Sequence, residues 1–356
     1  MRAALIGMPL SGKSTLFAAV AEAGGSHVHL GRPDQEHLAV VRVPDDRLLW
    51  LAEQHHPKKT TCAELEFLDV PGFDLSDEHG RGRAKAHWSA IRGCDLLVPV
   101  VRAFDDPTVA AYRSRVDPAA DVRELLTELL FADLEQVTAR IEKLEAALRK
   151  PTAQRDEQAK ELDLMRRLAA ALEAERPVGS VETTEAEARL LRSFAFLSEK
   201  PVLVVLNCAE DDVAGAAPES FEGCACLKLS AKIEEEIARL PAEDRPAFLA
   251  DLGLEAPAHD RLIRACYRQM RLVSFLTAGP EECRAWTVLD GTDAVTAAGQ
   301  IHSDIARGFI RAETVAFDDL RAAGNMKAAK AAGKVRLEGK SYRVQDGDVI
   351  LFRFNV

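Results

Sequence analysis

The stretch Gly7-Met8-Pro9-Leu10-Ser11-Gly12-Lys13-Ser14-Thr15 decides the fold of this chain. It satisfies the pattern G-x-x-x-x-G-K-[ST] and stands between a short apolar run, Ala3–Ile6, and a helix-like start at Leu16. Glycines in such a loop allow backbone N–H groups to turn toward phosphate oxygens. The stretch therefore predicts a P-loop that wraps the phosphates of a purine nucleoside triphosphate.

The side chains of this loop have separate expected roles. Lys13 should reach the terminal phosphates, and the hydroxyl of Ser14 should bind Mg²⁺. The remaining nucleotide contacts of the loop are expected from Gly7, Pro9, Leu10, Ser11, Gly12 and Thr15.

A second motif, Asp69-Val70-Pro71-Gly72, follows the strand-like segment Leu65–Val70 and matches D-x-x-G. In this motif the aspartate holds Mg²⁺ through water, and the amide of Gly72 can contact the γ-phosphate. The next residue, Phe73, is apolar where Ras-type enzymes have the glutamine that orients the attacking water. Hydrolysis is therefore expected to be slow or to recruit another group.

A third motif, Asn207-Cys208-Ala209-Glu210, ends a buried strand, Pro201–Asn207, where a GTPase carries Asn-Lys-x-Asp. Cys208 replaces the lysine that covers the base, and Glu210 replaces the aspartate that accepts hydrogen bonds from guanine. Because adenine lacks the 2-amino donor, this change argues against strict GTP selectivity. The alternative role for Asn207 is that of a strand-end cap. Backbone contacts to the base are expected from Ser230, Ala231 and Lys232.

The texture of the sequence divides the chain into three regions. Residues 1–112 and 195–271 alternate short apolar strands with amphipathic stretches, which is typical of parallel α/β layers. Residues 113–194 interrupt them with a charged helical segment whose apolar residues are spaced alternately by four and three, as in a coiled coil. These apolar residues are Leu130, Leu134, Val137, Ile141, Leu144 and Leu148. Residues 272–356 form a third unit, with a strand predicted at Arg284–Leu289 and a helix at Thr292–Gly308.

Composition and charge restrict the possible partners. The chain has 356 residues, a formal net charge of −11 and no apolar run of the roughly 18 residues that a membrane span needs. Its seven scattered cysteines and the absence of a signal-peptide pattern predict reduced thiols in the cytosol. Neither a membrane nor DNA is expected as a partner, and contact with RNA would need a local basic surface. The segment Asn325–Arg343 offers one, with six basic residues and the single acid Glu338.

These motifs together resemble the YchF subfamily of Obg-like ATPases, within the translation-factor class of P-loop GTPases. The resemblance covers nearly the whole chain and is most specific at its end, Phe352–Val356. Besides the three motifs above, it includes Pro44–Leu48, His56–Thr60, Ala278–Glu282, Gly299–His302, Arg307–Arg311, Gly333–Lys340 and Gln345–Val349.

The resemblance implies an α/β P-loop NTPase domain with an inserted helical coiled-coil arm and a C-terminal TGS domain of β-grasp fold. It also implies Mg²⁺-dependent binding of ATP at least as well as GTP, slow hydrolysis, association with the ribosome and ribosomal RNA, and regulation of translation or stress responses.

Two segments depart from the family pattern. The family's switch threonine has no counterpart, because no threonine occurs between Thr15 and Thr60, and His27 and His29 stand in that shortened stretch. The segment Gly80–Lys85 adds positive charge, so that Arg81 or Arg83 either acts on phosphate or RNA or belongs to a solvated loop. Two functions therefore stay open: a slow nucleotidase, or a nucleotide-dependent ribosome-binding module with little hydrolysis.

Overall fold

The computed structural model describes residues 1–25, 34–149, 154–241 and 243–355, and the chain divides into two compact units. The first unit holds most of residues 1–39 together with Glu66–His259, and the second holds Val40–Leu65 together with Asp260–Val356. Within the described ranges, no helix combines the length and the apolarity needed to cross a bilayer.

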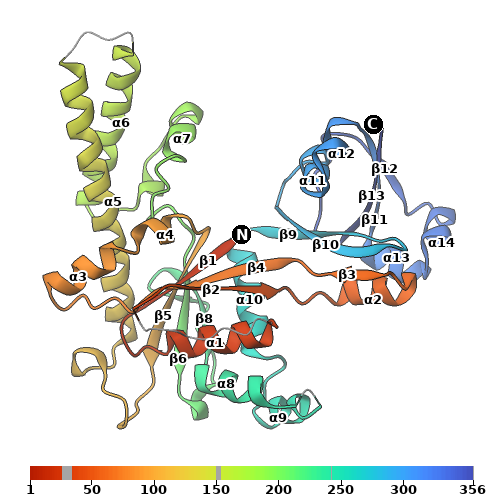
Figure 1. The fold of residues 1–356 in the computed structure, drawn as a ribbon, viewed down its shortest axis with the longest axis horizontal. Helices are drawn as coiled ribbons and strands as arrows, with labels where there is room; N and C mark the ends of the chain where they lie inside the picture. Colours follow the sequence, from red (N-terminus) through yellow and green to blue (C-terminus); the bar gives the residue numbers. More distant parts are fainter. Residues whose placement is uncertain (26–33, 150–153, 242, 356) are drawn as a thin grey trace. The chain divides into compact units, whose positions relative to one another are not determined.

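A seven-stranded sheet forms the centre of the first unit (Figure 1). In spatial order its strands are β2 (His37–Arg42), β4 (Glu64–Asp69), β1 (Arg2–Ile6), β5 (Leu96–Ala103), β6 (Leu203–Cys208), β8 (Cys224–Leu229) and β7 (Ser220–Phe221). The pairs from β4 to β8 are parallel. Strand β6 is buried along its whole length, which is why these strands are continuous apolar runs.

The parallel strands place the three sequence motifs at one edge of the sheet. The P-loop follows β1, Asp69 ends β4, and Asn207 lies near the end of β6. The other helices of this unit are α1 (Lys13–Ala23), α3 (Glu78–Lys85), α4 (Trp88–Arg92), α5 (Pro118–Leu148), α6 (Arg155–Glu173), α7 (Glu185–Leu191), α8 (Ala231–Arg239) and α9 (Arg245–Asp251). Short 3₁₀ turns occur at η1 (Tyr112–Ser114), η2 (Val178–Ser180) and η3 (Glu210–Asp212). Ligands of parallel sheets bind outside the carboxyl ends of the strands.

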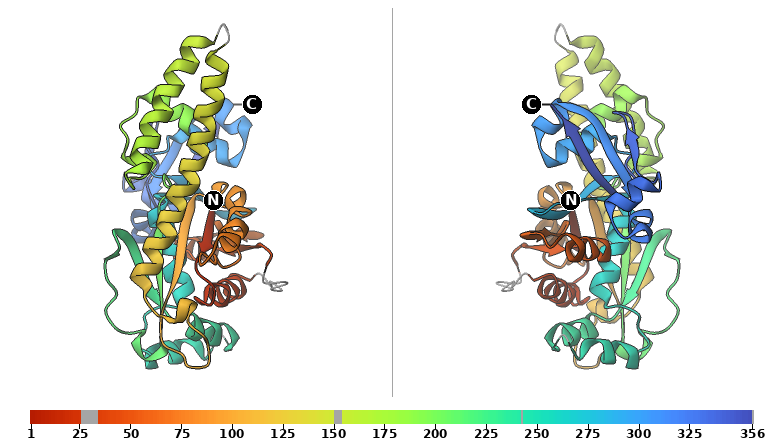
Figure 2. Two further views of the ribbon diagram at one scale, coloured as in Figure 1. Left: turned by 90° about the vertical axis from the view of Figure 1, so that its left-hand side faces the viewer. Right: turned by 90° about the vertical axis from the view of Figure 1, so that its right-hand side faces the viewer.

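Helices α5 and α6 lie side by side and run in opposite directions (Figures 1 and 2). The apolar residues predicted to form a seam, together with Leu162, Met165 and Leu172 of α6, belong to one apolar cluster between the helices. Two ion pairs, Arg140–Glu161 at 2.7 Å and Arg166–Glu145 at 2.7 Å, also connect them. The described parts of α5 and α6 are therefore two helices folded back on each other and packed along the seam that the sequence predicts. We call α5 and α6 the helical pair.

The second unit is built on a six-stranded sheet in the order β12 (Arg336–Glu338), β11 (Phe309–Ala316), β13 (Asp348–Phe354), β9 (Leu272–Thr277), β10 (Glu282–Leu289) and β3 (Lys59–Thr61). Strand β13 runs parallel to β9 and antiparallel to β11. Its helices are α2 (Asp46–His55), α10 (Ala258–Gln269), α11 (Ala294–Ile301), α12 (Ser303–Arg307), α13 (Phe317–Ala323) and α14 (Met326–Ala331). The helix predicted at Thr292–Gly308 is thus two shorter helices, with His302 between them as the cap of α12.

This grouping differs from the three regions expected from the sequence, where residues 40–65 belong to the nucleotide-binding domain. They cluster with the C-terminal unit because β3 adds to its sheet beside β10, and Arg47 of α2 forms an ion pair with Asp346 at 2.7 Å. Such long-range pairings leave no local signal in the sequence. The division into three functional domains stays a prediction.

Candidate functional site

The loop Gly7–Gly12 passes so close to β5 and β6 that its two terminal positions have no room for a side chain. At Gly12, which has φ +85°, a Cβ atom would collide with the side-chain amide of Asn207. At Gly7 a Cβ atom would lie 2.5 Å from the carbonyl oxygen of Val100. Both glycines of the motif are therefore required by the packing of the loop.

The ammonium group of Lys13 is buried at the centre of the site. It donates hydrogen bonds to the carboxylate of Asp69 and to the carbonyl of Val70. Burial lowers the pKa of Lys13, and the charge of Asp69 opposes that change. The hydroxyl of Ser14 donates to the other oxygen of Asp69 at 3.1 Å. A hydroxyl and a carboxylate side by side are oxygen ligands of the kind that Mg²⁺ prefers, so Ser14 and Asp69 fit that ion.

Gly72 packs directly on the P-loop, since a Cβ atom there would lie 3.0 Å from the Cα atom of Pro9. The amide of Phe73 donates to the carbonyl of Gly7 at 2.9 Å. The ring of Phe73 is buried against Trp88 in an edge-to-face contact, with centroids 5.1 Å apart. This side chain lies in the core and has no polar group to orient water.

Asn207 connects two loops of the site. Its side-chain nitrogen donates to the carbonyl of Ser11 at 2.9 Å, and its side-chain oxygen accepts from the amide of Ala231 at 2.9 Å. The residue is 4% exposed, so both polar atoms are satisfied inside the protein. In this structure Asn207 holds the P-loop against the segment Ser230–Lys232.

The carboxylate of Glu210 forms an ion pair with Lys232. The hydrogen bond to Glu210 raises the pKa of Lys232. Cys208, in contrast to the lysine of a GTPase, is buried and has no long stem to cover a base. At these two positions the site therefore has a buried cysteine and a glutamate paired with Lys232, where a GTPase has lysine and aspartate.

A cavity of about 1050 Å³ unites these loops. Of the residues predicted from the sequence, it is lined by Pro9, Leu10, Ser11, Gly12, Lys13, Ser14, Thr15, Gly72, Asn207, Cys208, Glu210, Ser230, Ala231 and Lys232. Gly7 and Asp69 are not in the lining, but Asp69 contacts Lys13 and Ser14, which are. Sequence analysis missed the wall formed by Phe104, Asp105, Asp106, Pro107 and Val109. The position of this loop after β5, beside the P-loop strand, is the signal that could have revealed it.

The side chain of Arg102 holds the loop that forms this wall of the cavity. Its side chain is 5% exposed and donates to the carbonyl oxygens of Phe104 at 3.1 Å, Ala110 at 3.2 Å and Val109 at 3.0 Å, and to that of Asp106 at 3.4 Å. The guanidinium carbon also lies 4.5 Å from the centroid of the Phe104 ring. Arg102 therefore folds the loop that lines the cavity.

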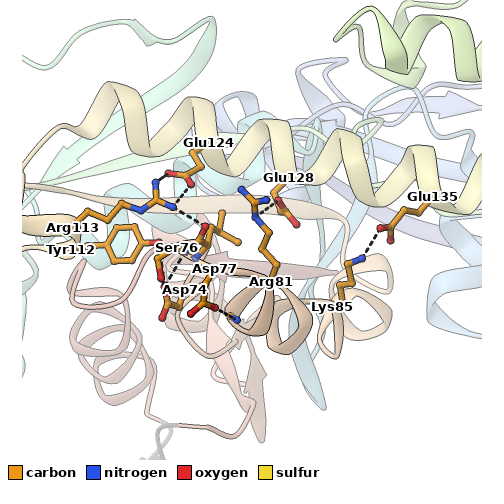
Figure 3. Close-up of polar contacts among 12 residues, drawn as sticks. Asp74, Ser76, Asp77, Arg81, Lys85, Tyr112, Arg113, Glu124, Glu128 and Glu135 are labelled. Atoms are coloured by element: carbon orange, nitrogen blue, oxygen red, sulfur yellow. Dashed lines mark hydrogen bonds and ion pairs between the residues drawn. The ribbon is translucent and has the colours of Figure 1, made fainter.

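The segment Gly80–Lys85, for which a solvated loop was one expectation, is part of helix α3. Asp77 caps the helix by accepting from the amide of Gly80 at 2.7 Å, which offsets the low helix propensity of glycine. Arg81 and Lys85 face acidic residues of α5 (Figure 3). Arg83 lies 3.6 Å from Asp74. None of these cations lines the cavity, so the structure gives no support to a role on phosphate. His27 and His29 lie outside the described residues.

The segment Asn325–Arg343 is less basic in the structure than in the sequence. Lys330 pairs with Glu313 at 2.8 Å and Lys334 with Asp319 at 3.0 Å. Arg336 pairs with Glu338 at 3.2 Å and with Asp348 at 3.5 Å. Acidic residues of β11, α13 and β13, which lie outside the segment Asn325–Arg343, thus neutralise several of its cations. In the described part of the chain, Lys327 and Lys340 have no acidic partner.

Known proteins resemble this chain along its whole length. The family model YchF-GTPase_C, described as "Protein of unknown function (DUF933)", matches residues 272–355. The chain is 42% identical to the ribosome-binding ATPase YchF of Bacillus subtilis, over the whole of both chains. The chain belongs to the YchF family. The YchF protein of Haemophilus influenzae is 37% identical and is matched over 99% of this chain and 98% of its own length.

The likeness extends to eukaryotes and to solved structures. Obg-like ATPase 1 of Oryza sativa is 34% identical over all of this chain and 92% of its own. The structure of the Schizosaccharomyces pombe YchF GTPase superposes with a TM-score of 0.84 at 28% identity, covering 99% of this chain and 97% of that one. The mixed α/β fold is therefore that of the YchF P-loop proteins.

Proposed function

We propose that this chain is a slow, ATP-preferring nucleoside-triphosphate hydrolase that associates with ribosomes in the cytosol. The observation that carries the proposal is the cavity in which the buried Lys13, the Ser14–Asp69 pair and Gly72 meet beside a loop that lacks the guanine clamp. Related proteins that are named ribosome-binding ATPases support the same conclusion.

The preference for ATP is inferred from the segment around Glu210. A GTPase needs a carboxylate that accepts from the N1–H and 2-amino groups of guanine, and a lysine stem over the base. Here Lys232 engages the carboxylate, and Cys208 stands in place of the stem. With the carboxylate engaged by Lys232 and no lysine stem over the base, the site should discriminate poorly between guanine and adenine.

Slow hydrolysis is inferred from Phe73, which is buried against Trp88. Lys13 would hold the terminal phosphates, the amide of Gly72 would contact the γ-phosphate, and Ser14 and Asp69 would hold Mg²⁺. The bound ion would neutralise charge that develops on the phosphate oxygens. The described residues of the cavity position the phosphates and stabilise their charge, but none is identified as a base for the attacking water. The rate of hydrolysis should therefore be low.

The surfaces proposed for the ribosome are the helical pair, as a coiled-coil arm, and the C-terminal unit, as a TGS domain of β-grasp fold. The order of strands in that unit, with β13 beside and parallel to β9, supports this assignment. We propose regulation of translation or of stress responses as the role of this association.

A second candidate function is a nucleotide-dependent ribosome-binding module with little hydrolysis. It is favoured by the absence of any threonine between Thr15 and Thr60, since that side chain senses the γ-phosphate and Mg²⁺ in switch GTPases.

Calorimetric titration of ATP and GTP, followed by single-turnover hydrolysis with and without ribosomes, tests both functions. We expect ATP to bind at least as tightly as GTP, and Lys13→Ala to weaken ATP binding about thirtyfold or more, because a buried charge contact is lost. Lys232→Ala is the matched control and should retain phosphate binding. A tenfold preference for GTP contradicts the proposed base preference. Hydrolysis that stays at background with ribosomes favours the second function.

A further inference from the structure

The backbone that follows Gly72 is held by the turn η1, which lies just before α5. The amide of Leu75 donates to the hydroxyl of Tyr112 at 2.9 Å, and the guanidinium of Arg113 donates to the carbonyl of Leu75 at 2.7 Å (Figure 3). Both polar backbone groups of one residue are thus bonded by two consecutive side chains. Leu75 is only three residues beyond the glycine proposed to contact the γ-phosphate.

The turn that presents these side chains is strained. Arg113 has φ 51° and Ser114 has φ 55°, so two consecutive residues other than glycine adopt the left-handed conformation. Residues in this conformation are disfavoured and persist only where the surrounding structure holds them. Strain of this kind is concentrated at functional sites and switch regions.

Arg113 also connects this backbone to helix α5. Its two terminal nitrogens lie 2.9 Å and 2.8 Å from the two carboxylate oxygens of Glu124, which is a bidentate pair. One guanidinium therefore bridges the segment after Gly72 and the first half of the helical pair.

Helix α3 repeats this attachment further along α5. Arg81 lies 3.8 Å from Glu128, and Lys85 lies 2.5 Å from Glu135. The three acids, Glu124, Glu128 and Glu135, follow one side of α5 that faces the segment in Figure 3. The segment is also compact, because a Cβ atom at Gly80 would collide with the carbonyl of Asp74.

We propose that Tyr112 and Arg113 are positioning residues for hydrolysis: they hold the backbone after Gly72 and link its movement to helix α5. The inference rests on the proposed nucleotide site. A change in the position of Gly72 on loss of the γ-phosphate is transmitted through Leu75 and Arg113 to Glu124 of α5. Conversely, a partner that moves the helical pair changes the position of Gly72 through the same contacts. Reciprocity of this kind follows from thermodynamic linkage.

The first test is the kinetics of Arg113→Gly. Glycine relieves the left-handed strain, so folding should be retained while both contacts are lost. We expect kcat for ATP to fall about tenfold or more with KM changed less than twofold, because the reacting groups are misplaced but the cavity lining is intact. Arg113→Lys should restore part of the rate. Arg123 of α5 forms a separate ion pair with Glu222, so Arg123→Ala is the matched control and should change kcat less than twofold.

The second test, hydrogen exchange of the full chain, needs no hydrolysis. In Arg113→Gly without nucleotide, the Leu75 amide and residues 118–128 should exchange about tenfold faster, with α1 unchanged. The proposal is overturned if exchange is unchanged both at the Leu75 amide and in residues 118–128. It is also overturned if kcat and nucleotide affinity fall equally while exchange becomes faster throughout the first unit, because that result indicates general destabilisation. Failure of the wild-type chain to bind ATP would refute the proposed function, and the exchange result would still decide whether Arg113 holds Leu75.

Discussion

Arg102 is a buried charged residue whose partners are backbone carbonyls. Four carbonyl oxygens of residues 104–110 accept from its guanidinium, at 3.0 to 3.4 Å. A planar group with five donors can hold four carbonyls at once, which is more than the three donors of a lysine allow. The shape of the loop at the cavity wall is therefore set by one side chain of the neighbouring strand.

We predict that Arg102→Met weakens ATP binding about tenfold or more, because several buried carbonyls lose their donor and the loop loses its shape. Inorganic tripolyphosphate needs only the Gly7–Thr15 loop, so its affinity should change less than twofold. Calorimetry with both ligands checks this, and Arg102→Lys is the matched control, with an intermediate effect. Equal losses for both ligands would show that the substitution disrupts the whole unit.

Helix α5 joins the helical pair to the sheet through a buried carboxylate. Asp133 is fully buried and accepts from Arg92 at 2.7 Å and from the amides of Leu197 at 3.0 Å and Ser198 at 2.8 Å. These bonds connect α5, α4 and the chain that returns to β6. The middle of the helix is anchored, whereas its distal end contacts α6.

Asp133→Ala should lower the free energy of unfolding by about 3–5 kcal/mol, because it leaves Arg92 and two amides without their acceptor. Glu145, on the same helix as Asp133, forms an exposed ion pair with Arg166 of α6. Glu145→Ala should lower the free energy of unfolding by less than about 1 kcal/mol. Urea denaturation of both variants gives the comparison. If Asp133→Ala is no more destabilising than Glu145→Ala, the buried network does not anchor α5.

Across the whole molecule, 57 acidic residues exceed 46 basic residues, so contact with RNA needs a local group of cations that acids do not neutralise. Several of the basic residues between 325 and 343 are already paired with acids of the C-terminal unit. Paired cations contribute less to counterion release, so the exposed Lys327 and Lys340 should carry more of any contact with phosphate.

We therefore predict that Lys327→Gln with Lys340→Gln reduces co-sedimentation with ribosomes and lowers the salt slope of binding by about one to two units. The matched double variant, Lys330→Gln with Lys334→Gln, removes the same charge from paired positions and should have the smaller effect. Equal effects, or none from the first variant, would place the RNA contact elsewhere, with the helical pair as the next surface to test.

Much of the site was predictable because its motifs are local. A loop between a strand and a helix needs glycine at fixed positions, and the parallel sheet then brings Lys13, Asp69 and Asn207 to one edge. The bonds by which Arg102 shapes the wall around Phe104, and the bonds of Asn207 to the P-loop, were not predictable. They depend on which strands are neighbours in the sheet and on how their side chains pack.

The sequence by itself determined the α/β class, the glycine-rich loop between a strand and a helix, Cys208 and Glu210 in the third motif, and the seam of the helical pair, because each is a short-range pattern of residue types. Only the tertiary structure decided that residues 40–65 join the C-terminal sheet, that acids neutralise part of the basic segment, and that Arg81, Lys85 and Arg113 face α5. The reason is physical: a partner distant in sequence is chosen by packing and charge in three dimensions, which a linear pattern does not contain.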